Sequence, residues 1–306
     1  FGPFQNPMVI NPGTPPIRIS GYFTSDFYGI LCDRTHRSGL LCGFLSQLNH
    51  FGSVEAFLLD HASLRMWANG DNVRLDPGAK MSTDWGVLYF FNLDEKDALA
   101  PYLQAVAKAN NIKPPTQSPA GWCSWDQFFT GVTAEDIQKN LQAITTLRSE
   151  LPLGFLQIDD GFEAQVGDWF EFKSTFPDGV AHLRQEIQSG GLTPGLWLAP
   201  FIVHPTSKLA REHPEFLLRK SDGRPVKAGF CWNTFAEALD LTHPGAMQYA
   251  VDVVGTAVHQ WGYPYLKLDF LYAAALKGKR YDPTLTRAQI LHLGMQAIRS
   301  AAGQET

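Results

Sequence analysis

Short apolar segments separated by turn-like residues dominate the first third of the chain. The segments ISGYFTSDFYGILCD (19–33) and GLLCGFLSQ (39–47) flank the polar RTHRSG and predict a β-hairpin. VEAFLLD (54–60), SLRMWAN (63–69) and VLYFF (87–91) follow, with NGDN and DPGAK between them. Regularly spaced strands without a helical period between them predict a β-sandwich.

The pattern changes after these strands. Residues 94–110 (DEKDALAPYLQAVAKAN) carry a helical period, and KPPTQSP at 113–119 is a stiff, proline-rich joint. We therefore predict two domains, residues 1–112 with the strands and a connecting helix, and residues 113–306.

Four strand-like segments, each followed by a helical pattern, make up the second domain. The strands are expected at GWCSW (121–125), LGFLQIDD (153–160), TPGLWLAP (193–200) and YPYLKLDFL (263–271), with an excursion at 216–244 after the third. Thr133 and Asp136 are expected to start the first helix. This α/β alternation predicts a parallel sheet with covered faces, as in a (β/α)8 barrel or a doubly wound sheet. No GxGxxG motif follows a strand, which disfavours nucleotide binding.

The composition excludes several classes of protein. Hydrophobic residues make up 44% of the 306 residues and charged residues 18%, the opposite of the balance in disordered chains. Lys and Arg total 25 against 30 Asp and Glu, and a net charge of -5 leaves no basic surface for nucleic acid. No apolar stretch approaches the ~20 residues of a membrane-spanning helix, so no membrane partner is expected.

The four cysteines, Cys32, Cys42, Cys123 and Cys231, are scattered and form no CxxC pair. A zinc site or a disulfide scaffold is therefore disfavoured, and no metal is expected. Cys32 and Cys42 either face each other across the hairpin or stay unpaired and buried, and we predict the second. Because the cysteines form no staple pattern, the chain is expected to be cytoplasmic.

Both ends are expected to be cuts within a longer protein. The chain opens FGPFQNPMVINPG, without an initiating Met or the layout of a signal peptide. It closes RSAAGQET directly after a predicted helix. Four βα units alone would expose open sheet edges, so the chain expressed alone is expected to be aggregation-prone or to depend on a partner segment.

Charged side chains gather where the predicted strands end, which is where both candidate architectures place their sites. Asp159 and Asp160 end LGFLQIDD, and Lys267 and Asp269 lie two apart in YPYLKLDFL, hence on one face of a strand. Lys and Asp are rarely buried without a partner or a function. The pair Lys267 and Asp269 is therefore the strongest single indication of a site.

Structural explanations compete with functional ones at the other positions. Asp-Asp-Gly is a common turn, and Trp122, Trp125 and Trp197 are core residues by frequency. Carboxylates beside flat aromatic rings nevertheless match a neutral polyhydroxylated ligand, which indicates a sugar. A lysine beside Asp269 favours the ionised carboxylate that a nucleophile needs.

Several motifs together resemble glycoside hydrolase family thirty-six, the melibiase-like group of α-galactosidases and raffinose synthases. They are GWCSWDQF, LQIDDGF, GDW, GLWLAP, ALDLTHP, WGYPYLKLDF and GKRYDPTLTRAQ, in order across residues 120–306. The resemblance implies a (β/α)8 TIM-type barrel, of which residues 113–306 are the first half. Residues 20–95 resemble the last part of that family's N-terminal β-sandwich.

The resemblance further implies a retaining α-galactosidase that releases terminal α-galactosyl residues from oligosaccharides without a cofactor. Asp269 would be the nucleophile that forms a covalent galactosyl-enzyme, and Lys267 would bind ring hydroxyls. The other implied site residues are Asp159 and Asp160, for the axial 4-hydroxyl and the 6-hydroxyl, and Trp125 and Trp197, for the walls of the sugar pocket.

Three features depart from the family pattern. Phe162 follows IDDG where the family usually has Trp, and CWNTFAEALD lacks an arginine that several members have; both are expected to alter leaving-group or substrate preference. A retaining glycosidase also needs an acid/base carboxyl ~5–5.5 Å from the nucleophile, which in this family comes from a later strand. Glu305 is expected on the wrong side of a helix, so the acid/base stays unassigned and the 306-residue chain alone is expected to be inactive.

Other functions stay open. A galactosyltransferase of the raffinose-synthase type would use the same site, and a degenerate relative would only bind sugar. A more distant alternative is an aldolase that forms a Schiff base on Lys267. The resemblance also implies a homo-oligomer, although no residue indicates an interface.

Overall fold

A computed structural model of the chain describes residues 21–58, 63–113, 119–304 and 306. The internal contacts form two compact units, one of residues 1–116 and 283–292, the other of residues 117–282 and 293–306. The joint predicted at 113–119, the ends of two predicted strands at 19–20 and 59–60, and Glu305 lie largely or wholly outside the described residues. The division into domains at 112 and 113 stays a prediction.

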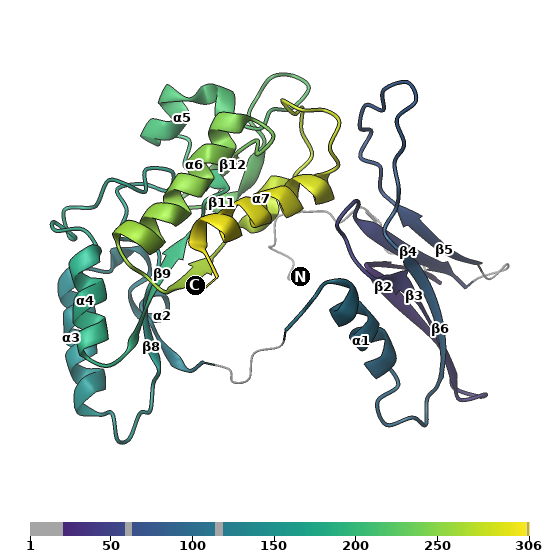
Figure 1. The fold of residues 1–306 in the computed structure, drawn as a ribbon, viewed down its shortest axis with the longest axis horizontal. Helices are drawn as coiled ribbons and strands as arrows, with labels where there is room; N and C mark the ends of the chain where they lie inside the picture. The colour runs from purple at the N-terminus through teal and green to yellow at the C-terminus, as the bar shows by residue number, and fades with distance from the viewer. Residues whose placement is uncertain (1–20, 59–62, 114–118, 305) are drawn as a thin grey trace. The chain divides into compact units, whose positions relative to one another are not determined.

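The first unit contains two three-stranded antiparallel sheets (Figure 1). One has the order β1-β4-β5, with β1 at Tyr22–Asp26, β4 at Gly52–Phe57 and β5 at Ser63–Ala68. The other has the order β2-β3-β6, with β2 at Tyr28–Asp33, β3 at Ser38–Phe44 and β6 at Gly86–Asn92. The predicted hairpin is confirmed, since β2 pairs with β3. The β-sandwich stays a prediction.

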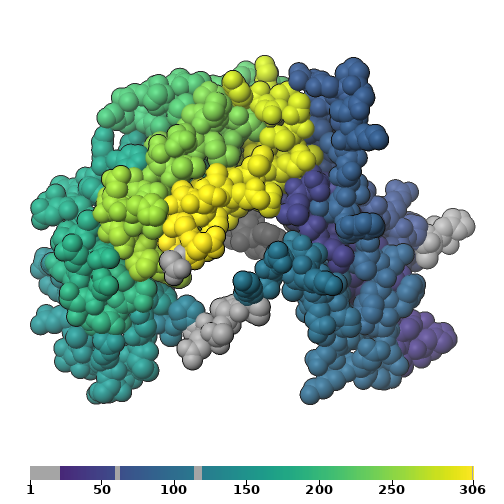
Figure 2. Space-filling view, viewed as in Figure 1, coloured from purple at the N-terminus to yellow at the C-terminus, as the bar shows by residue number. Residues whose placement is uncertain are grey.

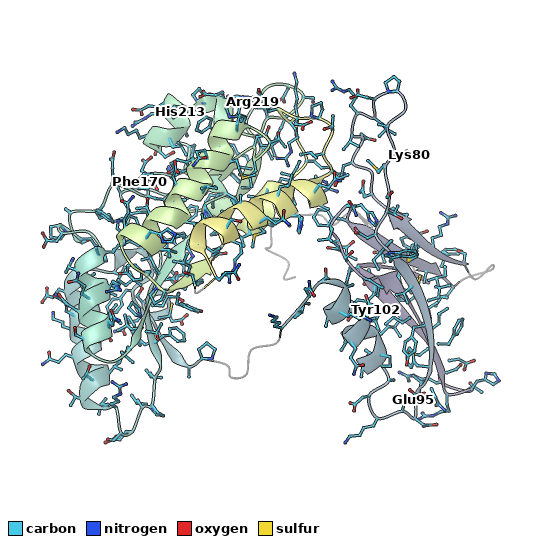
Figure 3. All side chains as sticks on the ribbon, in the orientation of Figure 1. Lys80, Glu95, Tyr102, Phe170, His213 and Arg219 are labelled. Carbon is cyan, nitrogen blue, oxygen red and sulfur yellow. The ribbon has the colours of Figure 1, made fainter. Side chains whose placement is uncertain are left out.

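Helix α1, at Ala100–Ala109, carries Tyr102, which is labelled in Figure 3. Tyr102 forms a buried core with Leu41 and Phe91, and its hydroxyl donates to the Phe44 carbonyl oxygen at 2.8 Å. Burial raises the pKa of Tyr102 to about 12, because the phenolate would lose its hydration. The helix is shorter than the predicted segment, since residues 93–99 form turns and a bend.

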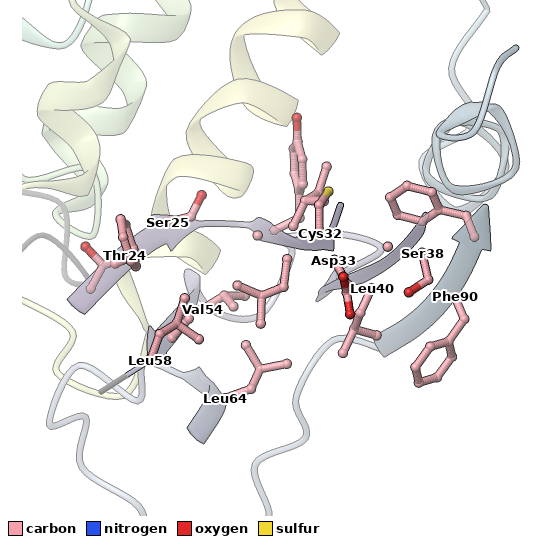
Figure 4. Close-up of a pocket in the computed structure, with 18 residues that line it drawn as sticks. Thr24, Ser25, Cys32, Asp33, Ser38, Leu40, Val54, Leu58, Leu64 and Phe90 are labelled. Atoms are coloured by element: carbon pink, nitrogen blue, oxygen red, sulfur yellow. The ribbon is translucent and has the colours of Figure 1, made fainter. Parts of the chain in front are cut away.

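A groove of about 840 Å³ in the first unit is lined by residues of both sheets (Figure 4). Its apolar side chains include Val54 of β4, Leu64 of β5 and Phe90 of β6. These side chains make the lining of the groove largely apolar.

All four cysteines are free. In the pairing of β2 with β3, Cys32 lies opposite Gly39 and Cys42 lies opposite Gly29, so the two thiols do not face each other. The prediction of unpaired thiols is confirmed. The prediction that they are buried holds for Cys42 but is wrong for Cys32, which is exposed.

The second unit is built on a four-stranded parallel sheet of order β13-β9-β8-β7. The strands are β7 at Gly121–Cys123, β8 at Phe155–Ile158, β9 at Thr193–Leu198 and β13 at Tyr265–Leu268. The predicted parallel sheet is confirmed. Its strands follow one another in chain order, without the reversal that marks the switch point of a doubly wound sheet.

Helices connect these strands, as the alternating pattern predicts. They are α2 at Trp125–Phe128 and α3 at Ala134–Thr146 after β7, α4 at Ala181–Ser189 after β8, α5 at Lys208–Glu212 after β9, and α7 at Arg287–Ala302 after β13. Thr133 and Asp136 start α3 as a capping box, in which each side chain accepts from the backbone N–H of the other residue. Within the described residues no helix is long and apolar enough to span a bilayer.

Helix α6, at Pro244–Gly255, and its π-helical continuation η3, at Thr256–Gln260, were not predicted. Glycines at both ends and β-branched valines weaken the helical signal of this segment. The structure compensates at the start, where His243 Nδ1 accepts from the Gly245 N–H at 3.1 Å. At the other end, His259 of η3 lies 2.7 Å from the Ala301 carbonyl oxygen, which places η3 against the end of α7 (Figure 2).

The excursion between β9 and α6 forms a small antiparallel sheet of order β10-β12-β11. Its strands are β10 at Ile202–Val203, β11 at Lys227–Cys231 and β12 at Thr234–Ala238. Trp232 and Asn233 join β11 to β12, and both have a positive φ, of 51° and 57°. Two consecutive residues of this kind form the type I′ turn typical of tight hairpins. Short 3₁₀ segments complete the unit: η1 at Phe129–Gly131, η2 at Pro214–Phe216 and η4 at Leu271–Ala275.

Candidate active site

A cavity of about 450 Å³ in the second unit contains all six site residues predicted from the sequence. It opens at the carboxyl ends of the parallel strands: Asp159 and Asp160 directly follow β8, and Asp269 directly follows β13. The full lining is Trp125, Phe129, Thr130, Asp159, Asp160, Trp197, Phe230, Cys231, Trp232, Asn233, Lys267, Asp269 and Phe270. The sheet therefore brings together side chains from four strand ends and from the β11–β12 hairpin.

Asp269 is held by the pairing of β13 with β9. Its backbone N–H donates to the Leu198 carbonyl oxygen at 2.9 Å, which continues the ladder beyond the last strand residue. The Phe270 N–H donates to Asp269 Oδ1 at 2.8 Å, and the Trp197 indole N–H donates to Asp269 Oδ2 at 3.3 Å. Each carboxylate oxygen thus accepts one N–H, and the group remains half-buried at the cavity wall.

Lys267 forms its ion pair with Asp159, and it also lies near enough to Asp269 for the two charges to attract each other, as expected. Lys267 Nζ lies 2.8 Å from Asp159 Oδ2, with side chains 38% and 2% exposed. Burial lowers the pKa of Lys267, but the hydrogen bond and charge of Asp159 outweigh it, and the pKa stays above its ordinary value. Strand β13 is half-buried along its length, whereas covered faces of the sheet had been expected.

Asp159 is the most enclosed polar group of the cavity, and its Oδ2 has two further donors. The Gln157 amide donates to it at 2.6 Å, and the Cys123 thiol donates to it at 3.2 Å. Its backbone N–H donates to Ser124 Oγ at 2.9 Å, which ties the end of β8 to the end of β7. This network keeps the Asp159 carboxylate in one orientation.

Asp160 lies beside Asp159 and is bound by the β11–β12 hairpin. The Trp232 indole N–H donates to Asp160 Oδ2 at 2.6 Å, and the Asp160 N–H donates to Asp159 Oδ1 at 3.1 Å. Burial raises the pKa of Asp160, while hydrogen bonds from Glu163 and Trp232 partly offset that rise. The β11–β12 hairpin thus contributes directly to the carboxylate cluster.

Backbone strain is concentrated at this cavity. Nine described residues other than glycine have a positive φ, and four of them line it: Phe129, Trp232, Asn233 and Phe270. For a bulky aromatic residue this conformation is unusual and costs about 1–3 kcal/mol. Strained backbone of this kind clusters at functional sites, because the surrounding structure must hold side chains where function needs them.

Sequence reasoning missed Gln157, Trp232 and three phenylalanines of the cavity lining, Phe129, Phe230 and Phe270. Gln157 left a signal, because it stands two before Asp159 in an apolar strand and therefore faces the same way. Trp232 and Phe129 left none, because loops far apart in the sequence bring them to the cavity. Trp197 is only 2% exposed yet lines the cavity, so it serves the core and the site together.

The two sequence departures have different structural meanings. Phe162 is fully buried outside the cavity lining, and its ring centroid lies 6.3–6.5 Å from those of four aromatic rings: Trp169, Phe172, Phe176 and Trp261. It is therefore a packing residue and does not touch the cavity. The segment that lacks the arginine forms the β11–β12 hairpin, which presents Trp232 and Asn233 to the cavity instead.

The arrangement suits a neutral ligand rich in hydroxyl groups. Three carboxylates and one ammonium supply acceptors and donors, and indole and phenyl rings supply apolar faces. Among the described residues, no three His, Cys, Asp or Glu side chains are grouped as a metal site would require.

Comparison with known proteins places this cavity in a family. The melibiase family model matches residues 125–298, which is more than half of the chain and includes the whole cavity lining. The α-galactosidase TtGalA of Thermus thermophilus, solved with p-nitrophenyl α-D-galactopyranoside, is similar with a TM-score of 0.69 and 29% identity, over 92% of this chain and 51% of that chain. The family thirty-six α-galactosidase AgaA of Geobacillus stearothermophilus, at 18% identity and a TM-score of 0.68, shows likeness of fold alone.

Curated relatives agree with this placement. α-Galactosidase 2 of Pediococcus pentosaceus is 24% identical over 264 residues, which cover 82% of this chain and 35% of that protein. α-Galactosidase Mel36A of Lactobacillus acidophilus is 30% identical over 95 residues, 29% of this chain and 13% of that protein. The chain thus spans about a third of the Pediococcus protein and about half of the Thermus chain. With its predicted resemblance to glycoside hydrolase family thirty-six confirmed, the chain belongs to the melibiase family.

Proposed function

We propose that this chain carries the galactose-binding site and the nucleophile of a retaining α-galactosidase that acts on terminal α-galactosyl residues of oligosaccharides. The parallel sheet would be the first half of a (β/α)8 barrel, a proposal that the chain-order sequence of its strands supports. The observation that carries the proposal is the meeting of six motif residues in one cavity.

Asp269 is the proposed nucleophile. One of its carboxylate oxygens attacks the anomeric carbon, the bond to the leaving oxygen breaks, and a galactosyl ester forms; water then releases galactose with its original configuration. The Asp269 carboxylate suits this step, because it lines the cavity that would hold the sugar. Its two hydrogen-bond donors are uncharged N–H groups rather than a cation bound to the attacking oxygen. The residue that protonates the leaving oxygen is not assigned.

Asp159, Asp160 and Lys267 are the proposed recognition groups for the sugar. Asp159 and Asp160 accept from the axial 4-hydroxyl and the 6-hydroxyl, and the Lys267 ammonium, held by Asp159, donates to a ring hydroxyl. A glucose molecule in the same position would leave buried carboxylate oxygens without partners, which is a strong basis for rejection. Trp125 and Trp197 form walls of the pocket.

Two alternatives use the same residues differently. Transfer to an acceptor sugar, as in a raffinose synthase, needs only that a sugar replace water in the second step. The aldolase hypothesis is disfavoured, because a Schiff base needs a neutral amine and the raised pKa of Lys267 keeps it charged.

Ligand discrimination by the chain tests the proposal without needing the unassigned acid. The intrinsic fluorescence of the cavity tryptophans and calorimetry would follow titration with galactose and with glucose at neutral pH. Galactose is expected to bind at least about tenfold more tightly than glucose, and Asp160→Asn is expected to remove most of that difference. The exposed Asp178→Asn serves as the control. Equal binding of both sugars, or unchanged preference in Asp160→Asn, would contradict the proposal.

A further inference from the structure

Glu163 is a buried carboxyl group directly behind the cavity, and the proposed mechanism does not use it. It is 2% exposed and lies in the loop after β8, where its backbone bridges to Phe172. The Gly161 N–H donates to Glu163 Oε2 at 3.2 Å. Glu163 also shares a hydrogen bond with the carboxyl of Asp160, a residue of the cavity wall.

Two carboxyl groups in such contact and burial do not both ionise, because each charge would lack water and repel the other. Burial and the Asp160 charge hold the pKa of Glu163 well above its ordinary value. The proton therefore belongs on Glu163, which is buried and does not line the cavity, and the charge on Asp160, which does. One oxygen of Glu163 then accepts from Gly161, and the protonated oxygen donates to Asp160.

The other titratable groups around this pair come from several elements. Asp159, the preceding residue, raises the pKa of Asp160 through its charge, and Lys173 lowers the pKa of both Asp160 and Glu163. Cys231 of β11 also lies near Asp160, and burial raises the pKa of its thiol. Asp159, Lys173 and Cys231 interact with the Asp160 carboxyl through charge, whereas the Glu163 carboxyl also forms a hydrogen bond with it.

We propose that Glu163 is a positioning residue for sugar recognition: as a neutral acid it donates to Asp160 and keeps that carboxylate ionised and aimed at the sugar. This inference rests on the proposed function, in which Asp160 accepts a galactose hydroxyl. It predicts that galactose affinity has an alkaline limit set by loss of the Glu163 proton. Above that limit the donor is gone and a second charge repels Asp160.

The pH dependence has a definite sign on each side. As pH rises through the pKa of Glu163, galactose affinity falls by about tenfold per pH unit, since one proton is lost. As pH falls through the pKa of Asp160, affinity falls because the acceptor becomes protonated. The hydrogen bond from Glu163 lowers the pKa of Asp160, so removal of that donor moves the acid limit to higher pH. The Lys267 pKa lies above its ordinary 10.5, so the ion pair of Lys267 with Asp159 does not titrate where the Glu163 limit is sought.

The experiment is galactose titration of the whole 306-residue chain from about pH 4 to pH 10, monitored by tryptophan fluorescence. Glu163→Gln keeps a donor for Asp160 and an acceptor for Gly161, so its affinity at neutral pH and its acid limit are expected to match the wild type while the alkaline limit disappears. Glu163→Ala is expected to bind galactose about tenfold to a hundredfold more weakly, with the acid limit at higher pH. Glu150→Gln, an exposed carboxyl change, is the control.

Three further measurements separate the outcomes. Cys231→Ser is expected to retain the alkaline limit of galactose affinity. If the limit disappears in Cys231→Ser and persists in Glu163→Gln, the limit belongs to the thiol and the inference is overturned. An alkaline limit that persists in Glu163→Gln, or an acid limit unchanged in a folded Glu163→Ala, would also overturn it. If Asp160→Asn leaves galactose binding intact, the proposed function fails; if Asp160→Asn abolishes binding while the Glu163 variants keep the wild-type profile, only this inference fails.

Discussion

Replacing Lys267 with Met removes the ammonium from the most enclosed ion pair of the cavity while keeping a side chain of similar length. The ammonium lies 2.8 Å from Asp159 Oδ2, and the Asp159 side chain is 2% exposed. After the change, Gln157 and Cys123 still donate to Asp159, but no cation balances its charge. The variant therefore isolates the charge balance of one buried carboxylate.

The structure sets the size of the effect between two limits. At 2.8 Å and an effective dielectric constant of about 20, the gross attraction is about 6 kcal/mol. Removing one partner of a fully buried pair costs about 3–5 kcal/mol, whereas an exposed pair is worth about 0–1 kcal/mol. Because Lys267 is 38% exposed and Asp159 is enclosed, we expect a loss of about 2–3 kcal/mol in the free energy of unfolding. For a unit of this size that corresponds to roughly 4–12 °C in melting temperature.

Denaturant titration and calorimetry at neutral pH measure the loss, and a double-mutant cycle with Asp159→Asn measures the coupling. The double variant is expected to be at least about 1 kcal/mol more stable than the sum of the single changes predicts. Lys139→Met is the matched control, because its pair with Glu135 is 66% and 72% exposed and solvent screens it, so the change should alter stability far less. A Lys267→Met loss as small as that of Lys139→Met, with additive single changes, would refute the reasoning.

Two other substitutions test packing and recognition separately. Phe162→Ala is expected to cost about 3–5 kcal/mol of stability, because the fully buried Phe162 ring fills space among four aromatic rings. Phe162→Trp, which introduces the residue usual in the family, should cost about 1–3 kcal/mol because the larger ring overpacks the core. Denaturant titration checks both, and a stable Phe162→Ala would contradict the packing role. Trp232→Phe removes the indole donor of Asp160 and is expected to weaken galactose about tenfold or more with little change in melting temperature. Unchanged galactose affinity in calorimetry would show that this hydrogen bond does not support recognition.

Local patterns predicted most of the second unit. The strands that carry the site were expected at their observed places, because short apolar runs bounded by turns are a local signal. The helix start at Thr133 and Asp136 was also predicted, because residues that cap a helix are a local signal as well. The meeting of Asp160 and Asp269 in one cavity then followed from the rule that the carboxyl ends of parallel strands form a common edge.

Partnerships across the cavity could not be predicted in this way. Lys267 pairs with Asp159 rather than Asp269, since strand order and side-chain reach decide which carboxylate is nearest. Trp232 reaches Asp160 only because the excursion folds into a hairpin with a strained two-residue turn. Glu163 has no signal in the sequence, because its burial against Asp160 depends on how the loop after β8 folds. Such contacts join residues far apart in the sequence, where periodicity carries no information.

Covalent labelling tests the central claim, that Asp269 is the nucleophile of a retaining α-galactosidase. The reagent is 5-fluoro-α-D-galactosyl fluoride, whose fluoride leaves without protonation, so the unassigned acid is not required. Peptide mapping by mass spectrometry is expected to find one fluorogalactosyl group on the peptide that contains Asp269, with no labelling of Asp269→Ala. Labelling of Asp159 or Asp160 instead, or a folded chain that binds galactose but is never labelled, would contradict the account.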